Sequence, residues 1–137
     1  MQGRQPSTPD DVQALVAFLA TLDYPSSPHR TPEGRITEAA RRGKSLFEGK
    51  AGCVNCHRAP HFTTPETFDV GLGSSGVESQ EYNPPPLRGI FARRRFLHDG
   101  RARSLRAVLG QHRPEDVGGE PLRDSELNDL LAYLMSL

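Results

Sequence analysis

The sequence predicts an all-α domain of about four helices joined by long irregular loops. Residues 8–22 and 123–137 each carry an apolar stripe with the spacing of an amphipathic helix. The chain of 137 residues contains 12 Pro and 13 Gly, which break regular structure and predict long connections. Its hydrophobic content of 35% is low for a globular domain, so a cofactor with apolar surface of its own would help to complete the core.

The first helix is expected over residues 8–22. Thr8 can cap it, Pro9 suits its first turn, and Asp10 and Asp11 favour the positive end of the helix dipole. A Pro-rich linker follows at 23–36. The apolar stripe of this helix consists of Val12, Leu15, Val16, Leu19 and Leu22.

Three more helices are expected. Thr37 can cap one that covers roughly 38–48 and ends near Gly49, and Ser104 can cap a short one that reaches about Gln111. Glycines and a run of prolines make residues 58–90 irregular. The last helix turns an apolar face of Leu127, Leu130, Leu131, Leu134 and Leu137 inward.

The first and last helices resemble each other. Aligned without gaps, 8–22 and 123–137 share Leu, Ala, Leu and Leu at four positions, and five other positions are conservative. Any two amphipathic helices look alike to a degree. These two also match in their acidic residues, an aromatic position and their length, which a shared leucine stripe does not explain. We therefore expect 1–35 to be the closing helix of a preceding related domain plus a linker, and 36–137 to be the domain proper.

Residues Cys53, Cys56 and His57 form a C-x-x-C-H motif. This is the attachment pattern of haem c, in which two thiols bond to the haem vinyl groups and the histidine ligates the iron. The chain has no other cysteine. The motif predicts one covalently bound haem c.

Two other chemistries use a C-x-x-C pair. A structural zinc site usually has a second tight pair of ligands, which this chain lacks, although His61 and another histidine could supply ligands. A thioredoxin-like redox pair follows a strand in a βαβ unit, and no such unit is expected before Cys53. Both alternatives remain open but are less favoured than haem.

The charge pattern gives no general affinity for nucleic acid or membrane. Lys and Arg together equal Asp and Glu at 17 each. No apolar run of about 18 residues predicts a transmembrane helix, and no secretory signal is visible in 1–22. Because haem c proteins are exported, we expect a periplasmic or otherwise exported bacterial protein whose true start is missing here.

Several segments carry a family resemblance. They are ARRGKSLF at 40–47, TFDVG at 67–71, NPPPLRG at 83–89, FLHDGR at 96–101 and SLRAVL at 104–109. With the C-x-x-C-H motif, they resemble the C-terminal haem domain of the bacterial di-haem cytochrome c peroxidase family, which includes the MauG-like proteins.

The resemblance covers about residues 36–137 and implies a cytochrome c-like, all-helical domain with long loops. In the family two such domains lie side by side, and the C-terminal haem accepts electrons and passes them on. Only one C-x-x-C-H is present in this chain, so we expect no catalytic residues here. The parent protein could still be a peroxidase-type oxidoreductase.

The second axial ligand of the iron is expected to be His112. Met1 lies far upstream and Met135 belongs to the last helix, so neither is a convincing ligand. The family commonly has a Met or Tyr ligand near the end of the short helix after HDG, where this chain has His112. His98, in the HDG segment, is expected to lie near the haem and to form a hydrogen bond.

His61 follows His57 too closely to reach the other face of the haem, and His29 is expected to be solvated in the linker.

Seven arginines lie between Arg88 and Arg106, against one acid. Arginine pairs well with carboxylates, so Arg88 is the first candidate for binding a haem propionate, with Arg93, Arg94 or Arg95 next. Most of these arginines are expected to be solvated, and some could dock an acidic redox partner.

The sequence therefore predicts an electron-transfer c-type cytochrome domain whose partner is a donor or acceptor cytochrome or cupredoxin. The alternatives are the electron-entry domain of a peroxidase-type enzyme and a haem-based ligand sensor.

Overall fold

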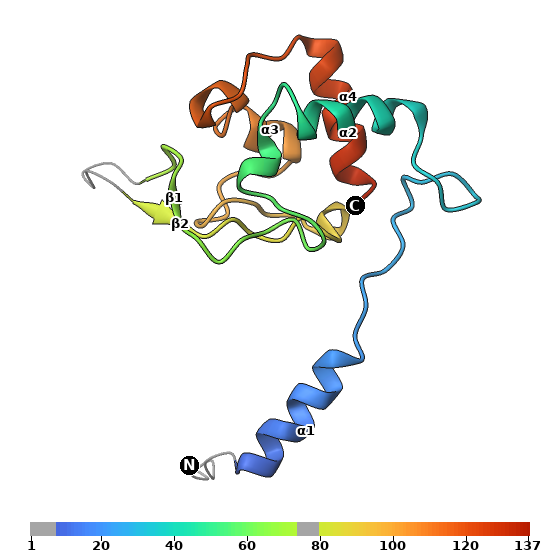
Figure 1. Ribbon diagram of the computed structural model, residues 1–137, viewed down its shortest axis with the longest axis vertical. Coiled ribbons are helices and arrows are strands. Elements are labelled where there is room, and N and C mark those ends of the chain that lie inside the picture. Colours follow the sequence, from blue (N-terminus) through green and yellow to red (C-terminus); the bar gives the residue numbers. More distant parts are fainter. Residues whose placement is uncertain (1–7, 74–79) are drawn as a thin grey trace.

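The computed structural model describes residues 8–73 and 80–137, which form a mostly helical domain and one helix that stands apart from it (Figure 1). The two short strands pair antiparallel, with Phe68 opposite Tyr82. The all-α prediction is confirmed. The two-residue ladder lies within 58–90, a region that was expected to be irregular. The elements in chain order are α1 (Pro9–Ala20), α2 (Glu38–Glu48), η1 (Cys53–Asn55), β1 (Phe68–Asp69), β2 (Glu81–Tyr82), η2 (Ile90–Ala92), α3 (Leu105–Leu109), η3 (Pro114–Val117) and α4 (Asp124–Met135), where η marks a 3-10 helix.

The predicted caps of three helices are present. The side chains of Thr8, Thr37 and Ser104 each accept a hydrogen bond from a backbone N–H in the first turn of the helix that follows. α1 and α4 end slightly earlier than the sequence pattern suggested. α3 ends at Leu109, with Gly110 as its C-cap.

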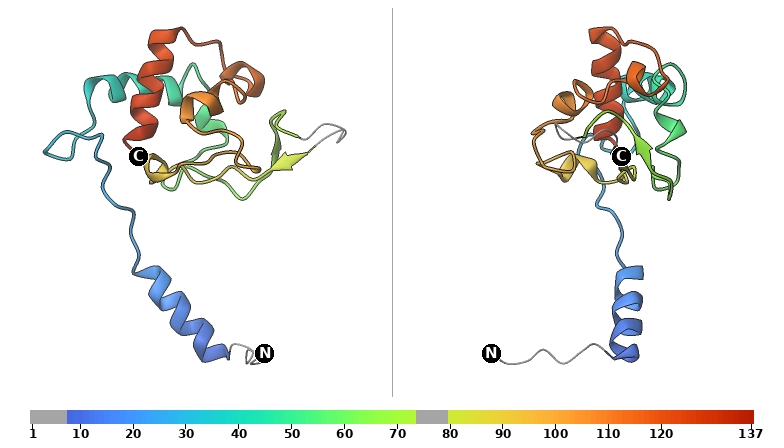
Figure 2. Two further views of the ribbon diagram at one scale, coloured as in Figure 1. Left: turned by 180° about the vertical axis from the view of Figure 1, so that it is seen from behind. Right: turned by 90° about the vertical axis from the view of Figure 1, so that its left-hand side faces the viewer.

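Helices α2 and α4 cross in close contact (Figure 2). Gly43 makes this approach possible, since a Cβ there would lie 1.9 Å from the carbonyl oxygen of Asp129. The Arg42 guanidinium donates two hydrogen bonds to the Asp129 carboxylate, at 2.7 and 2.8 Å. Lys50 bonds Glu126 at 2.7 Å. Two ion pairs therefore fix the register of the crossing.

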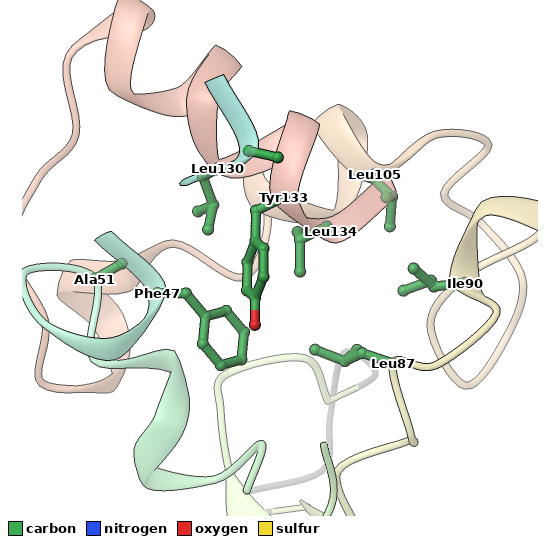
Figure 3. Close-up of a cluster of buried hydrophobic side chains, with 9 residues drawn as sticks. Phe47, Ala51, Leu87, Ile90, Leu105, Leu130, Tyr133 and Leu134 are labelled. Atoms are coloured by element: carbon green, nitrogen blue, oxygen red, sulfur yellow. The ribbon is translucent and has the colours of Figure 1, made fainter. Parts of the chain in front are cut away.

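The core lies beneath this crossing (Figure 3). The rings of Phe47 and Tyr133 meet edge to face, with centroids 5.4 Å apart. Leu87 and Ile90 approach from the segment around η2, so the core joins elements from both halves of the domain. The buried cluster consists of Ala40, Phe47, Ala51, Leu87, Ile90, Leu105, Leu130, Tyr133 and Leu134.

Helix α1 has no buried residue and stands clear of the domain in both figures (Figures 1 and 2). The linker after it packs on the domain, because Ser27 donates a hydrogen bond to the Met135 carbonyl at 2.6 Å and Arg30 to the Ser136 carbonyl at 2.8 Å. Packing against α4 thus begins upstream of residue 36.

Candidate haem-binding site

The C-x-x-C-H segment forms a single tight turn after α2. Gly52 adopts a left-handed conformation (φ +64°) and starts η1. The backbone N–H groups of Cys56 and His57 both donate to the Cys53 carbonyl, at 3.3 and 2.9 Å. Two thiols and one imidazole are therefore carried by one short turn, as attachment to one flat macrocycle requires.

Both thiols are in a setting unlike that of a redox pair. Burial raises the pKa of Cys53 to about 11. Burial also raises the pKa of Cys56. Reactive C-x-x-C cysteines have lowered pKa values that favour the thiolate, so this turn does not favour thiol–disulfide exchange.

His57 is oriented by the loop that follows it. Its Nδ1 lies 3.0 Å from the Phe62 carbonyl oxygen, which can only accept, so Nδ1 carries the proton and Nε2 keeps its lone pair. Burial lowers the pKa of His57, so the imidazole is neutral near pH 7. A neutral imidazole with one nitrogen bonded to a carbonyl is the usual form of a metal-ligating histidine.

A cavity of about 310 Å³ opens beside this turn, and a smaller one of about 80 Å³ adjoins it. The walls are mostly apolar and come from the NPPPLRG segment, α3 and the HDG loop. An apolar slot with a few polar groups suits a haem. Seven residues line both cavities: Cys56, His57, Leu87, Ile90, Leu105, Val108 and His112.

His112, 55 residues after His57 in the chain, lines the same two cavities. It follows α3, where its backbone N–H donates to the Val108 carbonyl at 2.7 Å. Burial lowers the pKa of His112, and the nearby His57 lowers it further. The side-chain Nδ1 is buried and has no hydrogen-bond partner among the described residues. An unpaired buried nitrogen costs about 1–3 kcal/mol, and a metal bond would remove that cost.

His98 lines the larger cavity. Its ring stacks on Tyr82 with centroids 4.6 Å apart, and its Nε2 lies 3.3 Å from the Tyr82 hydroxyl oxygen. The Asp99 carboxylate is 4.0 Å from the same nitrogen. The sequence analysis did not single out Tyr82. It lines the cavity from β2, which pairs with β1, and that pairing is not visible in the local sequence.

The arginines divide into two groups. Arg88 is not among the residues that line the cavity, and its guanidinium carbon lies 5.0 Å from the centre of the Tyr24 ring. Arg93 and Arg95 do line the cavity. Arg94 is exposed and lies outside the lining. Of the four candidate arginines, Arg93 and Arg95 line the cavity, and Arg88, the first choice, does not.

The other candidate ligands lie elsewhere. His61 is exposed, and His29 meets the edge of the Phe91 ring. Met135 packs against the core, while Met1 lies outside the described residues. Within 8–73 and 80–137 no three His, Cys, Asp or Glu side chains gather in a way that could hold a metal ion. The structure thus gives no support to a zinc site.

Comparison with known proteins identifies the family to which the chain belongs. The sequence pattern of the cytochrome c family matches residues 40–137. The chain belongs to the cytochrome c family. Members of that family carry c-type haem and transfer electrons, so the chain is an electron-transfer haem protein of this class.

Three relatives show which cytochrome c proteins this chain resembles. The chain is 29% identical to the hydrazine synthase gamma subunit of Kuenenia stuttgartiensis, over 95% of this chain and 50% of that protein. It is 31% identical to the methylamine utilization protein MauG of Methylophilus methylotrophus, over 91% and 45%. It is 30% identical to a cytochrome-c peroxidase of Pseudomonas sp. (strain SCT), over 85% and 33%. The resemblance to a cytochrome c domain of the MauG and peroxidase family is confirmed.

A solved structure of a related protein has a similar fold. A chain of the Kuenenia stuttgartiensis hydrazine synthase pressurized with xenon superposes with a TM-score of 0.77 at 27% identity, covering 95% of this chain and 56% of that one. The chain spans about half the length, or less, of the curated relatives it matches. Across the described part of the chain, no helix is both long and apolar enough to cross a membrane.

Proposed function

We propose that this domain carries one haem c, bound through Cys53 and Cys56, and that its function is to accept single electrons and pass them on. The observation that supports this best is that His57 and His112 line the same two cavities, and that Nδ1 of His112 is buried with no hydrogen-bond partner among the described residues. Cys53 and Cys56 would hold the haem through thioether bonds, each thiol adding across one vinyl group with its hydrogen going to the neighbouring carbon. The haem iron supplies the one-electron chemistry.

The two histidines are assigned as the axial ligands. Two imidazoles favour the ferric state more than His and Met do, because Met raises the potential. The haem would be six-coordinate, low-spin and of relatively low potential. If both histidines bind the iron, peroxide would have no free position there, and electron transfer is the role that fits this ligand set.

The surrounding residues orient the cofactor. The Phe62 carbonyl holds His57, and His98 with Tyr82 borders the cavity. Arg93 and Arg95 replace Arg88 as the preferred propionate partners, because they line the cavity and Arg88 does not.

The parent protein is proposed to be larger and exported. The chain covers about half of its relatives, and α1 exposes an apolar face that matches the inner face of α4. We assign 1–35 as the closing helix of a preceding domain plus its linker. The partner is a donor or acceptor cytochrome or cupredoxin. Periplasmic location follows from the requirements of haem c attachment.

The assignment of His112 can be tested in protein matured in a haem c-competent host. His112→Ala should convert a low-spin optical spectrum to high-spin and open the iron to carbon monoxide. His61→Ala is the matched control, since His61 is exposed, and should leave the spectrum unchanged. A His112→Ala protein that stays low-spin, with His98→Ala turning high-spin, would transfer the role to His98.

The attachment can be tested by mass. Intact-mass analysis should show one haem that survives acid-acetone extraction, and Cys53→Ala with Cys56→Ala should release it. An extractable haem in the unaltered protein would contradict the assignment.

The second candidate is an electron-entry domain of a peroxidase-type oxidoreductase, which the similarity to MauG and a cytochrome-c peroxidase favours. Turnover with hydrogen peroxide by this chain at about 1–1000 per second would make its own haem catalytic. Carbon monoxide binding by the unaltered ferrous protein would instead favour a ligand sensor.

A further inference from the structure

Arg101 joins three segments that contribute to the cavity wall. Its Nε donates a hydrogen bond to the Gln111 side-chain oxygen at 2.7 Å, and its Nη2 donates to the Leu72 carbonyl at 3.3 Å. Its Nη1 bonds the Asp99 carboxylate at 2.8 Å. Leu72 lines the cavity, while Asp99 directly follows one lining residue and Gln111 directly precedes another. One guanidinium therefore connects three parts of the wall that are far apart in the sequence.

The backbone at Arg101 is held by contacts of its own. Its N–H donates to the Asp99 carboxylate at 3.0 Å. The next residue, Ala102, is almost fully buried, and its carbonyl accepts a hydrogen bond from the Phe96 N–H at 3.0 Å. Because Asp99 bonds both the N–H and the guanidinium of Arg101, the side chain is directed toward Gln111.

The segment that carries His112 has little regular structure of its own. Helix α3 has only five residues, and His112 lies beyond its end, in the connection to η3. The backbone N–H groups of Gln111 and His112 both donate to the Val108 carbonyl, at 2.9 and 2.7 Å. Nε2 of Gln111 also donates to the Ala107 carbonyl at 3.3 Å. Gln111 thus connects the end of α3 to Arg101, one residue before His112.

Arg113, on the other side of His112, makes a more local contact. It donates two hydrogen bonds to the Asp116 carboxylate, at 2.9 and 2.7 Å. Both partners belong to the same short stretch of chain, so this pair shapes that stretch and does not anchor it to another segment. Arg101 and Arg113 each bond an aspartate, but of these two only Arg101 reaches across from a separate loop.

We infer that Arg101 is a positioning residue for the second iron ligand, and that it holds His112 in the cavity through the bond to Gln111. This inference rests on the proposed function, in which His112 binds the iron. Movement of His112 away from the cavity would break the bond between Arg101 and Gln111. Hydrogen bonds from a charged donor are stronger than those between neutral groups. Arg101 therefore limits how often the iron loses its second ligand.

The test measures ligand dissociation in the haem-loaded ferrous chain. Carbon monoxide binds a six-coordinate iron only after one ligand has left, so the rate at saturating carbon monoxide reports the departure of His112. Arg101→Gln should raise this limiting rate by about tenfold or more, the range expected for a hydrogen bond to a charged group. Stopped-flow absorbance measures the rate. The ferric spectrum of Arg101→Gln should stay low-spin, unlike that of His112→Ala, because the ligand itself is still present.

Three further variants identify the cause of the change. Gln111→Ala alters an exposed side chain, leaves the pair between Arg101 and Asp99 in place, and should raise the rate to a similar extent. The double variant should gain little more, because both changes break the same bond. Arg101→Lys keeps the positive charge but loses the planar fork, so it should not restore the rate. Restoration by Lys would overturn the inference, since charge alone would then explain the effect.

Arg113→Gln is the matched control. Its side chain is 54% exposed, and an exposed ion pair contributes little, so the limiting rate should stay within about twofold of that of the unaltered protein. Equal increases in Arg101→Gln and Arg113→Gln would overturn the inference. Should Arg101→Gln fail to load haem, an unchanged rate in Gln111→Ala would overturn it as well.

The same measurement separates failure of this inference from failure of the proposed ligation. If the rate for the unaltered protein rises in proportion to carbon monoxide concentration without reaching a limit, the iron has an open position, and both the ligation by His112 and the role of Arg101 are wrong. If a limit is reached but neither Arg101→Gln nor Gln111→Ala raises it, only the role of Arg101 is wrong.

Discussion

Helices α1 and α4 carry nearly the same apolar pattern but meet opposite surroundings. Leu130 is fully buried in α4, whereas Leu15, its counterpart in α1, is 56% exposed. The difference comes from the surface that each helix can reach. α4 packs against Gly43 of α2, and nothing in the described chain offers α1 such a surface. An apolar stripe shows that a helix needs a partner but not which one.

The largest expected effect comes from truncating this stripe in each helix. Leu130→Ala should lower the free energy of unfolding by about 2–5 kcal/mol, since it leaves a cavity at a fully buried site. Leu15→Ala should change it by no more than about 0.5 kcal/mol. Chemical denaturation of the haem-loaded chain measures both. Equal losses would mean that α1 packs on the domain in solution.

A smaller loss of stability is expected from adding a side chain at Gly43, where α2 and α4 approach closely. Gly43→Ala should destabilise the domain by about 3 kcal/mol, because the new Cβ meets the Asp129 carbonyl oxygen at 1.9 Å. In an exposed helix the same change would stabilise by about 1 kcal/mol. Ser45→Ala, at an exposed position of α2, is the control and should have little effect. A stabilised Gly43→Ala protein would show that the crossing is looser than described.

The smallest effect concerns the acids in the first turn of each helix. The hydrogen bond from Lys50 is the main reason that the pKa of Glu126 falls to about 2. A lowered carboxyl pKa adds stability above the unfolded value of about 4.3, and this is lost as pH falls toward 2. Glu126→Gln should therefore destabilise the domain at neutral pH, with the difference shrinking between about pH 5 and 2.

Asp11 in α1 provides the matched control for that measurement. Its pKa is also lowered, by hydrogen bonds from Thr8, but those bonds lie within α1. Asp11→Asn should leave the domain's free energy of unfolding between about pH 5 and 2 unchanged. A shift as large as that of Glu126→Gln would show that α1 and the domain unfold together.

The sequence was sufficient for features set by local chemistry. Caps at Thr8, Thr37 and Ser104 and the spacing of apolar residues located the helices to within a few residues. The C-x-x-C-H motif located the segment that forms a single tight turn carrying two thiols and one imidazole. The resemblance to the MauG and peroxidase family was also confirmed.

The site was predictable in part. His112 was chosen as the second iron ligand because it follows the short helix after the HDG segment. It lines the cavity together with His57. Its ligation of iron remains a prediction. Arg88 was chosen for its place in a motif, but its side chain lies over Tyr24. Tyr82 was missed because nothing near it in the chain marks a contact with His98.

The limit has one physical cause. Capping, turn geometry and helical periodicity depend on residues a few positions apart, so they can be read along the chain. Which arginine faces the cavity, which helix is buried and which imidazole nitrogen is left unpaired depend on contacts between segments far apart in sequence. Those contacts exist only once α2, α4 and the segment from Leu87 to Ile90 have packed into one core.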